Sequence, residues 1–418
     1  MAGDWDRIRD EVREWLDANW DPDLELLTWR DRLLDSGWGC PTWPTEMFGR
    51  GLSSGEAEVV TAELARLGAP GPPAGAAMSL AAPTLLAMAS SELKRRLLPA
   101  IVTGRNTWCQ LFSEPGNGSD LAGLTTSADR DGDVWVVNGQ KVWTTGAHRA
   151  DYAMLLARTD WDAPKHRGIT FFVIDMHQTG VEVRGIRQMN GHSSFNEVFL
   201  TDAHVAHDHV VGEVHGGWAA AMTTLAHERG LGPRAPRARN PVGRAAQQAA
   251  EEARAYNQTY VWYPQRSGRV DLAVPRALAA GRQDDPLVRQ AVADLESLDR
   301  VATWTVARAR AARARGRNPG PEGSVAKLTG SEIARRANAV HTTLAGAHGM
   351  LSDADAPEGG VVAEILVSTP AISIAGGTDE IQHDIVGERA LGLPKGPSVD
   401  RDIPFREVRT NAVTRRPG

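Results

Sequence analysis

Cysteine is scarce in this sequence, with only Cys40 and Cys109 among 418 residues. Two cysteines fit no disulfide framework and no multi-cysteine metal site, and this usage suits a reducing cytoplasm. Positive charge is not in excess either, because 46 basic against 52 acidic residues give a net charge of −6. Proteins that bind nucleic acid concentrate positive charge, so the composition argues against nucleic acid as a partner.

Long apolar runs are also missing. The N-terminal MAGDWDRIRDEVREWL carries acidic residues and no apolar core, so it does not resemble a signal peptide. The most apolar run, residues 73–89, contains Pro83 and is shorter than the roughly 20 residues that a membrane-spanning helix needs. We interpret it as a buried helix pair and expect a cytoplasmic protein without a membrane partner.

The signatures of several enzyme classes are absent from the sequence as well. The histidines in HERG, GAHG and MNGHSS have no metal-ligand spacing, so we expect no metal site. No Ser-His-Asp set with a recognisable nucleophile elbow is present. The Arg-rich run 307–317 is best interpreted as a solvated helix face, given the negative net charge.

Hydrophobic periodicity divides the chain into helical, β-rich and helical zones, which predicts an α+β fold. The predicted domains are 1–108 (helical), 109–214 (β), 215–395 (helical) and a loosely ordered tail at 396–418. Asn138-Gly139 lies between β-prone runs and predicts a hairpin turn. Residues 232–284 are rich in Arg, Pro and Gly and are interpreted as an insertion-like loop with some helix. The expected helices are 4–19, 54–68, 74–89, 91–104, 286–316 and 322–345, and the expected strands are 152–158, 168–175, 181–186 and 194–200.

Three short motifs carry the candidate chemistry: SEPGNGSD (113–120), NGQKVWTT (138–145) and GGTDEIQ (376–382). The first is a Gly-rich polar loop, the second places Trp143 at a strand end, and the third is a turn that opens a helix, where anions bind well. Taken singly, each has a plain structural interpretation as a turn or a half-buried strand.

Together and in this order, the motifs resemble those of the acyl-CoA dehydrogenases, over residues 5 to 395. The resemblance implies an N-terminal helical domain, a central β-barrel-like domain and a C-terminal four-helix bundle. It implies FAD as cofactor, an acyl-CoA as substrate and an electron-transfer flavoprotein as electron acceptor. By the same resemblance Ser119, Arg229 and Gly376 contact the substrate. The positions that it assigns to the flavin are Gln110, Phe112, Ser113, Gly118, Ser119, Trp143, Thr145, Thr378 and Glu380.

The catalytic base is the main departure from this family pattern. Many members carry a Glu directly before Gly-Thr, and that position is Gly376 here. Other members place the base on an earlier helix in a Leu-x-x-Glu-Arg pattern, which here is Leu225 to Arg229. Glu228 falls on the apolar stripe of this helix, where desolvation would raise the pKa of a carboxylate. We therefore predict Glu228 as the base, although a Glu-Arg pair on a helix is ordinarily a solvated ion pair.

Two further departures affect cofactor contacts between subunits. The family's Arg-x-x-Phe-Gly segment has no counterpart, since the matching region reads GRQDDPLVRQAVADL (281–295). A Gln of the next helix is replaced near Thr343. These losses are compatible with a homo- or hetero-oligomer, a dimer or tetramer, in which another chain completes some sites. The alternatives are a non-catalytic or half-site subunit of a heteromeric enzyme, and a flavin oxidase or monooxygenase of the same fold.

Overall fold

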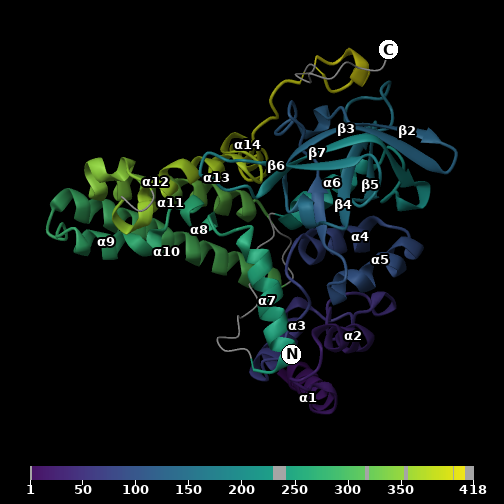
Figure 1. The fold of residues 1–418 in the computed structure, drawn as a ribbon, viewed down its shortest axis with the longest axis horizontal. Helices are drawn as coiled ribbons and strands as arrows, with labels where there is room; N and C mark the ends of the chain where they lie inside the picture. The colour runs from purple at the N-terminus through teal and green to yellow at the C-terminus, as the bar shows by residue number, and fades with distance from the viewer. Residues whose placement is uncertain (1, 229–241, 316–319, 353–355, 399, 410–418) are drawn as a thin grey trace.

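The computed structural model describes residues 2–228, 242–315, 320–352, 356–398 and 400–409. A helical layer at the N-terminus packs under a seven-stranded sheet, and a second set of helices projects to one side (Figure 1). This agrees with the predicted α+β class. The first five helices are α1 (Ala2–Asn19), α2 (Leu26–Ser36), α3 (Ser54–Arg66), α4 (Ala82–Met88) and α5 (Ser91–Thr103).

The N-terminal helix, predicted over 4–19, buries an apolar stripe at a spacing of four residues. Ile8, Val12 and Leu16 are at most 1% exposed and pack with Trp29 of α2. A capping box at Ser53 and Glu56 starts α3, because each side chain satisfies the other's backbone N–H. Helix α2 was not predicted.

The sheet has the strand order β1-β4-β2-β3-β7-β6, with β5 pairing with β4 on a branch. β1 runs parallel to β4, whereas β3–β7, β6–β7 and β4–β5 are antiparallel. The predicted strand 181–186 is confirmed to the residue, and 194–200 extends further. The strands are β1 (Trp108–Leu111), β2 (Ser127–Asp131), β3 (Val134–Thr145), β4 (Tyr152–Arg158), β5 (Ile169–Asp175), β6 (Val181–Ile186) and β7 (Phe195–Ala206).

The hairpin turn predicted at Asn138-Gly139 is wrong. Both residues lie inside β3, where the pairing with β7 shifts register between Val137 and Gly139. A Cβ at Gly139 would lie 2.7 Å from the Cα of Thr126, so glycine serves the close approach of two backbones there. The turn between β2 and β3 instead contains Gly132, which has a φ of +58°.

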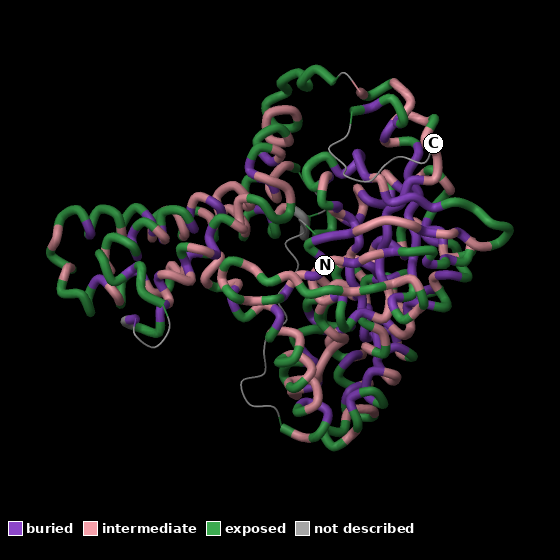
Figure 2. The backbone as a smooth tube through the Cα atoms, turned by 45° about the horizontal axis from the view of Figure 1, so that its top comes forward, coloured by how far each residue is buried: buried purple, intermediate pink, exposed green. Residues whose placement is uncertain are grey.

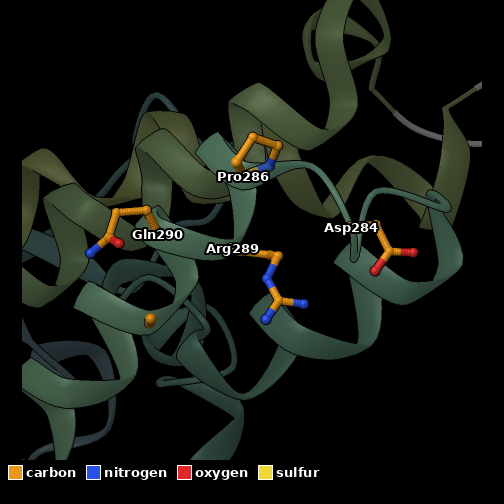
Figure 3. Close-up of a pocket in the computed structure, with 5 residues that line it drawn as sticks. Asp284, Pro286, Arg289 and Gln290 are labelled. Carbon is orange, nitrogen blue, oxygen red and sulfur yellow. The ribbon is translucent and has the colours of Figure 1, made fainter.

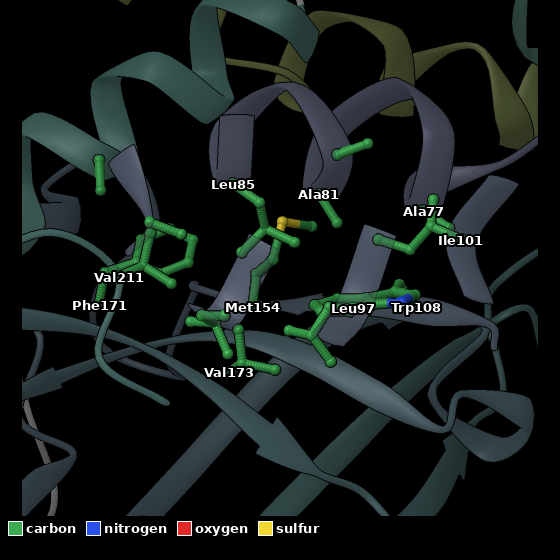
Figure 4. Close-up of a cluster of buried hydrophobic side chains, with 14 of the residues drawn as sticks. Ala77, Ala81, Leu85, Leu97, Ile101, Trp108, Met154, Phe171, Val173 and Val211 are labelled. Atoms are coloured by element: carbon green, nitrogen blue, oxygen red, sulfur yellow. The ribbon is translucent and has the colours of Figure 1, made fainter. Parts of the chain in front are cut away.

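The central core joins the helices to one face of the sheet. Leu85 and Ala81 point from above onto Met154, Phe171 and Val173 of β4 and β5 (Figure 4). The predicted helix pair at 73–89 is one helix, because a π-helical turn at Ala77–Ala81 continues directly into α4.

The remaining helices form an arm beside the sheet. α9 to α12 project away from the sheet (Figure 1), and most of their residues are exposed or intermediate, whereas buried residues gather in and under the sheet (Figure 2). The bounds are α6 (Gly217–Glu228), α7 (Arg244–Gln258), α8 (Tyr263–Arg266), α9 (Ala273–Ala279), α10 (Pro286–Ala314), α11 (Glu322–Ala345), α12 (Val361–Ser368), α13 (Pro370–Ile374) and α14 (Asp379–Arg389).

The segment interpreted as an insertion-like loop is largely helical where it is described. Its main element, α7, lies along α2 of the N-terminal layer. Gln248 accepts a hydrogen bond from the Leu26 N–H at 2.8 Å, and Glu252 pairs with the buried Arg30 at 2.6 Å. These contacts give the segment a fixed place in the fold.

One stretch, Glu358–Arg389, is long and apolar enough by composition to cross a membrane, and 28% of its most apolar window is buried. It is not one continuous helix, because Gly376 and Gly377 have φ values of +70° and +87°. The resulting helices α12, α13 and α14 have 8, 5 and 11 residues, each shorter than a membrane span requires.

The prediction of a loosely ordered tail is wrong for residues 404–408. Phe405 is 0% exposed and its backbone N–H donates to the Ala163 carbonyl at 3.0 Å. Pro404 forms a β-bridge with Pro164. An aromatic side chain that can be buried in the β-domain therefore outweighs the polar, Pro-containing composition of the tail.

Candidate active site

Helix α6 is fixed against the sheet by small residues. A Cβ at Gly217 would lie 2.5 Å from the Thr170 carbonyl carbon, so glycine lets the start of the helix touch β5. Ala220 and Ala221 are fully buried, and the Thr224 hydroxyl lies 2.9 Å from the Thr84 hydroxyl of α4. These contacts set the direction in which the last turn of α6 points.

Glu228 ends this helix next to the turn that precedes α14. A Cβ placed on Gly376 would lie 4.0 Å from Oε1 of Glu228, and apart from residues 375–377 no other described atom comes within 4 Å of it. The two alternative positions of the base therefore meet at one point in space. Glu228 itself is exposed in the single chain, so the desolvation expected from its place on the apolar stripe is not supplied by the described residues. Arg229 lies outside the described residues.

The turn at Gly376 is anchored through the next residues of the chain. Thr378 caps α14 by accepting the Ile381 N–H at 3.3 Å. Asp379 accepts hydrogen bonds from Lys327 at 2.6 Å and Arg335 at 2.9 Å, both on α11. Burial alone would raise the pKa of Asp379, but these cationic donors outweigh it and hold the pKa far below its usual range. A charged carboxylate thus ties the turn to α11.

Exposed Glu380 follows Asp379 in the first turn of α14. Its pKa is lowered by its own backbone N–H and by the Thr378 hydroxyl, so this carboxylate already interacts with the helix start. Gln382 is fully buried, and its Oε1 has no hydrogen-bond partner among the described residues. The helix start therefore retains an unsatisfied polar atom beside the turn.

The end of β3 presents the aromatic residue of the second motif. Trp143 is 57% exposed, has a φ of +63° and meets Phe195 edge to face at 5.8 Å. Thr145, two residues later in β3, is the strand-pairing partner of Phe195 in β7. The Thr144 hydroxyl donates to the Gln110 carbonyl at 3.4 Å, which places β1 beside this strand end. The sheet thereby offers a free aromatic face next to hydroxyl and amide groups.

The first motif lies against the same strand. The Val142 N–H donates to the Ser113 carbonyl at 2.9 Å, and Lys141 donates to the Phe112 carbonyl at 3.1 Å. The side chain of Phe112 is buried in the core, so only its backbone can meet a ligand. Gly118 and Ser119 are exposed at the far end of the loop.

A buried ion pair holds this loop. Lys141 Nζ lies 2.9 Å from Oε1 of Glu114. The same oxygen accepts the backbone N–H of Thr126, and Oε2 accepts the backbone N–H of Thr125. Burial raises the pKa of Glu114, but Lys141 and these donors reverse the effect and lower it to about 2. Glu114 is therefore a structural anchor of the motif.

Tyr263 is a site residue that the sequence reasoning missed. Burial is the largest cause that raises the pKa of this phenol, and the negative charge of Glu228 adds to the effect. A hydrogen bond from Thr145 acts in the opposite direction. The same α7–α8 segment is tied to the sheet by Trp262, whose Nε1 donates to the Ser194 hydroxyl at 2.7 Å. The cluster of aromatics at 256–263 was the available signal, but nothing in the sequence joined it to Thr145.

The predicted site residues therefore fall into four groups. Oε1 of Glu228 lies 4.0 Å from the Cβ position of Gly376, and the charge of Glu228 and a hydrogen bond from Thr145 both act on the phenol of Tyr263. Gln110, Phe112, Ser113, Trp143 and Thr145 share the end of the sheet, whereas Thr378 and Glu380 lie at the start of α14. Gly118 and Ser119 lie on the exposed loop, and no described contact joins them to the other groups.

The residues present fit a flavin. The exposed face of Trp143 and the neighbouring Thr145 suit a flat heteroaromatic ring. The unsatisfied Gln382 oxygen beside the α14 start suits a polar group in the same place. A separate surface hollow of about 470 Å³ lies at the start of α10, lined by Asp284, Pro286 and Arg289 among others (Figure 3). None of the predicted site residues lines this hollow.

The N-terminal, middle and C-terminal parts of the chain each match a family of known proteins. Three family models match: the acyl-CoA dehydrogenase N-terminal domain at 5–105, the middle domain at 109–203 and the C-terminal domain at 272–391. The acyl-CoA dehydrogenase IpdE1 of Mycobacterium tuberculosis is 35% identical over 94% of this chain and 98% of its own.

Solved structures give the same result. The ChsE4-ChsE5 complex from Mycobacterium tuberculosis matches with a TM-score of 0.64 and 28% identity, over 94% of this chain and 98% of that one. The Tcur3481-Tcur3483 steroid ACAD matches with a TM-score of 0.65 and 26% identity, over 94% of this chain and 98% of that one.

Proposed function

Because the chain belongs to the acyl-CoA dehydrogenase family and is an oxidoreductase of that family, we propose that it oxidises a bulky acyl-CoA to the trans-2-enoyl-CoA with Glu228 as base. The observation that carries this proposal is the 4.0 Å between Oε1 of Glu228 and the Cβ position of Gly376. A base at either position reaches the same point, so the loss of the usual carboxylate at 376 is offset by the one at 228.

The α-C–H bond of a thioester is weakly acidic, so the reaction needs a positioned base and support for the developing enolate. Glu228 takes the α-proton onto its carboxylate. The Gly376 N–H donates to the thioester oxygen, and the Asp379 anchor keeps that N–H in place through the short link of Gly377 and Thr378. Tyr263 contributes a phenol that takes part in a hydrogen bond with Thr145 and lies within the electrostatic range of Glu228.

FAD, when bound, supplies the acceptor for the β-hydrogen and its electron pair. Trp143 and Thr145 would cover and hydrogen-bond the flavin ring, with Gln110 and the backbone of Phe112 and Ser113 along its edge. The start of α14, at Thr378 and Glu380, would take the phosphate and adenosine half. Gly118 and Ser119 would close over the substrate side.

The substrate class follows from the missing side chain. Gly376 leaves room beside Glu228 that a glutamate would fill, so a branched or ring-bearing acyl group can enter. One of the solved relatives, the Tcur3481-Tcur3483 steroid ACAD, is named for a ring-bearing substrate, which supports the same class of substrate here. Arg229, the residue after Glu228 in the sequence, is kept as a substrate contact on the family resemblance alone.

Assembly with a further chain would cover the site. Glu228 is exposed in the single chain, and the arm exposes Trp304 and Ile374 at 66% and 65%. A second copy or a related chain would bury such residues, and one of the solved relatives is a two-component complex. The function proposed is that of a cytoplasmic dimer or tetramer passing electrons to an electron-transfer flavoprotein.

An anaerobic titration tests the reaction and the base together. The purified holoprotein is mixed with butyryl-, octanoyl-, isobutyryl- and cyclohexane-1-carbonyl-CoA while the flavin absorbance is followed. Wild type is expected to bleach most with the branched or ring-bearing esters, and Glu228→Gln is expected to keep its flavin but not bleach. Equal bleaching in both proteins would remove Glu228 from the mechanism, and a clear preference for short linear chains would refute the substrate class.

A non-catalytic subunit is the second candidate, and the exposure of Glu228 together with the missing Arg-x-x-Phe-Gly segment favours it. Such a subunit would purify without colour and would acquire flavin reduction only with a partner chain. A coloured protein that bleaches alone rejects it. Rapid reoxidation by oxygen after bleaching would instead indicate an oxidase or monooxygenase.

A further inference from the structure

The C-terminal segment Asp400–Val408 packs on the loop between β4 and β5. The Phe405 N–H donates to the Ala163 carbonyl and the Arg406 N–H to the Trp161 carbonyl, both at 3.0 Å. Phe405 and Val408 are 0% and 4% exposed. Backbone pairing and two buried apolar side chains fix this segment on the β-domain.

A lysine of that loop connects the segment to the first motif. Lys165 Nζ lies 2.6 Å from Oδ2 of Asp400 and 3.0 Å from Oδ1 of Asp120. Asp120 directly follows Ser119 in SEPGNGSD. Lys165 is only 8% exposed, so water competes weakly for its charge, and both carboxylates raise its pKa against the effect of burial.

A second connection runs through an arginine below the segment. The Cζ of Arg158 lies 3.3 Å from the ring centroid of Phe405. The same guanidinium donates to the carbonyls of Ala122 at 2.7 Å and Leu124 at 3.1 Å. Arg158 is fully buried, so the ring of Phe405 completes the cover of a group that holds the end of the motif loop.

We propose that Lys165 and Asp400 are positioning residues, through which the C-terminal segment holds the Ser113–Gly123 loop in the geometry that binds the acyl-CoA. This inference rests on the proposed function only for the identity of the ligand. The exposed loop has few contacts of its own at Gly118 and Ser119, so the bridge at Asp120 restricts its motion. A more mobile loop loses more conformational entropy when the ligand binds, which weakens binding without changing the reacting groups.

The test compares four variants of the full-length holoprotein. Asp400→Asn and Lys165→Gln remove the bridge, and Lys165→Arg keeps its charge. Arg406→Gln is the matched control, because it breaks an ion pair at 2.6 Å between the same segment and Asp162 of the β4–β5 loop, and this pair includes no residue of the motif loop. Hydrogen exchange of residues 113–124 is measured without any acyl-CoA, and KM and kcat are measured with the panel ester that best bleaches wild type.

Asp400→Asn and Lys165→Gln are expected to speed exchange in 113–124 and to raise KM roughly three- to tenfold at nearly constant kcat. Lys165→Arg is expected to restore most of both, and Arg406→Gln to resemble wild type. Unchanged exchange in Asp400→Asn and Lys165→Gln would overturn the inference, and so would an equal effect of Arg406→Gln. If none of the acyl-CoA esters bleaches the flavin of wild type, the proposed function fails. The exchange measurement, which needs no acyl-CoA, still decides the positioning role.

Discussion

Because the Glu228 carboxylate lies near the Cβ position of residue 376, the base can be moved from the end of α6 to the turn before α14. In the double variant Glu228→Ala/Gly376→Glu the carboxylate would start from a Cβ that lies 4.0 Å from the wild-type Oε1. Apart from residues 375–377, no other described atom lies within 4 Å of that Cβ, so the new side chain meets no clash with the rest of the fold at its base. We expect this variant to recover activity that Glu228→Ala loses.

The magnitudes follow from the geometry. A positioned general base contributes about 10²- to 10⁴-fold, so Glu228→Ala is expected to slow flavin reduction by that factor. The backbone of residue 376 has a φ of +70°, where a side chain other than glycine costs about 1–2 kcal/mol. That cost lowers the melting temperature but leaves the fold intact. The double variant is expected to regain at least about tenfold of the lost rate, a gain of about 1.4 kcal/mol in the barrier.

The rescue should also depend on the substrate. A glutamate at 376 fills the space that the glycine leaves, so the double variant is expected to favour straight over branched acyl groups. In the single variant Gly376→Glu two carboxylates share one small region, and like charges there disfavour the ionised form of one of them. That variant is expected to be slower than wild type with every ester.

Anaerobic stopped-flow absorbance of the flavin band measures these rates, with butyryl-CoA and isobutyryl-CoA as the paired substrates. Glu213→Gln is the matched control, because Glu213 is exposed in the loop before α6 and lies outside the proposed site. The reasoning is refuted if Glu228→Ala reduces its flavin at the wild-type rate. It is also refuted if the double variant binds FAD, retains its fold and gains nothing over Glu228→Ala.

Two predictions concern the frame around the site. Lys141→Met leaves the buried Glu114 without its partner and is expected to lower the free energy of unfolding at pH 7 by about 3–5 kcal/mol. Since the pKa of Glu114 is depressed from 4.5 to about 2, its stabilisation is present above pH 4.5 and is lost as the pH falls toward 2. Wild type should lose about 3 kcal/mol over that window in urea titrations, and a flat profile would contradict this. Gly217→Ala forces a Cβ to within 2.5 Å of the Thr170 backbone, so α6 must shift. The free energy of unfolding should fall by about 1–3 kcal/mol and part of kcat should be lost, as measured by thermal melts and kinetics. The control Ala219→Ser changes an exposed residue of the same helix and should resemble wild type in both measurements.

Periodicity predicted elements well where one face is buried by neighbours close in the fold. Helix α1 and the strand Val181–Ile186 follow from spacing, because α1 buries one apolar stripe and the strand alternates half-buried with exposed residues as far as Arg184. The same reasoning failed at Asn138-Gly139, where the glycine serves the close approach of Thr126 rather than a turn. It failed again at Phe405, because the ring finds its partner Arg158 far away in sequence.

The candidate site divides along the same line. The motif residues on β1, β3 and the α14 turn could be chosen from the sequence because each motif is local and the resemblance orders them. The exposure of Glu228 could not be predicted from the helix pattern. Ala221 and Thr224 are covered by the sheet and α4, whereas Glu228 lies one turn beyond that cover.

Tyr263 shows why the remaining site residues escaped prediction. Its place depends on α7 lying along α2, on Arg149 donating to the Ala255 carbonyl at 3.0 Å, and on Trp262 bonding to Ser194. Each of these contacts joins segments that are remote in sequence, and no single one of them would bring the phenol within electrostatic range of Glu228. Only their combination sets its position, so a residue on an apparently inserted segment becomes part of the site through tertiary packing. Substitutions that detach α7 from α2 should therefore affect the base as well as stability, although they lie far from the reacting atoms.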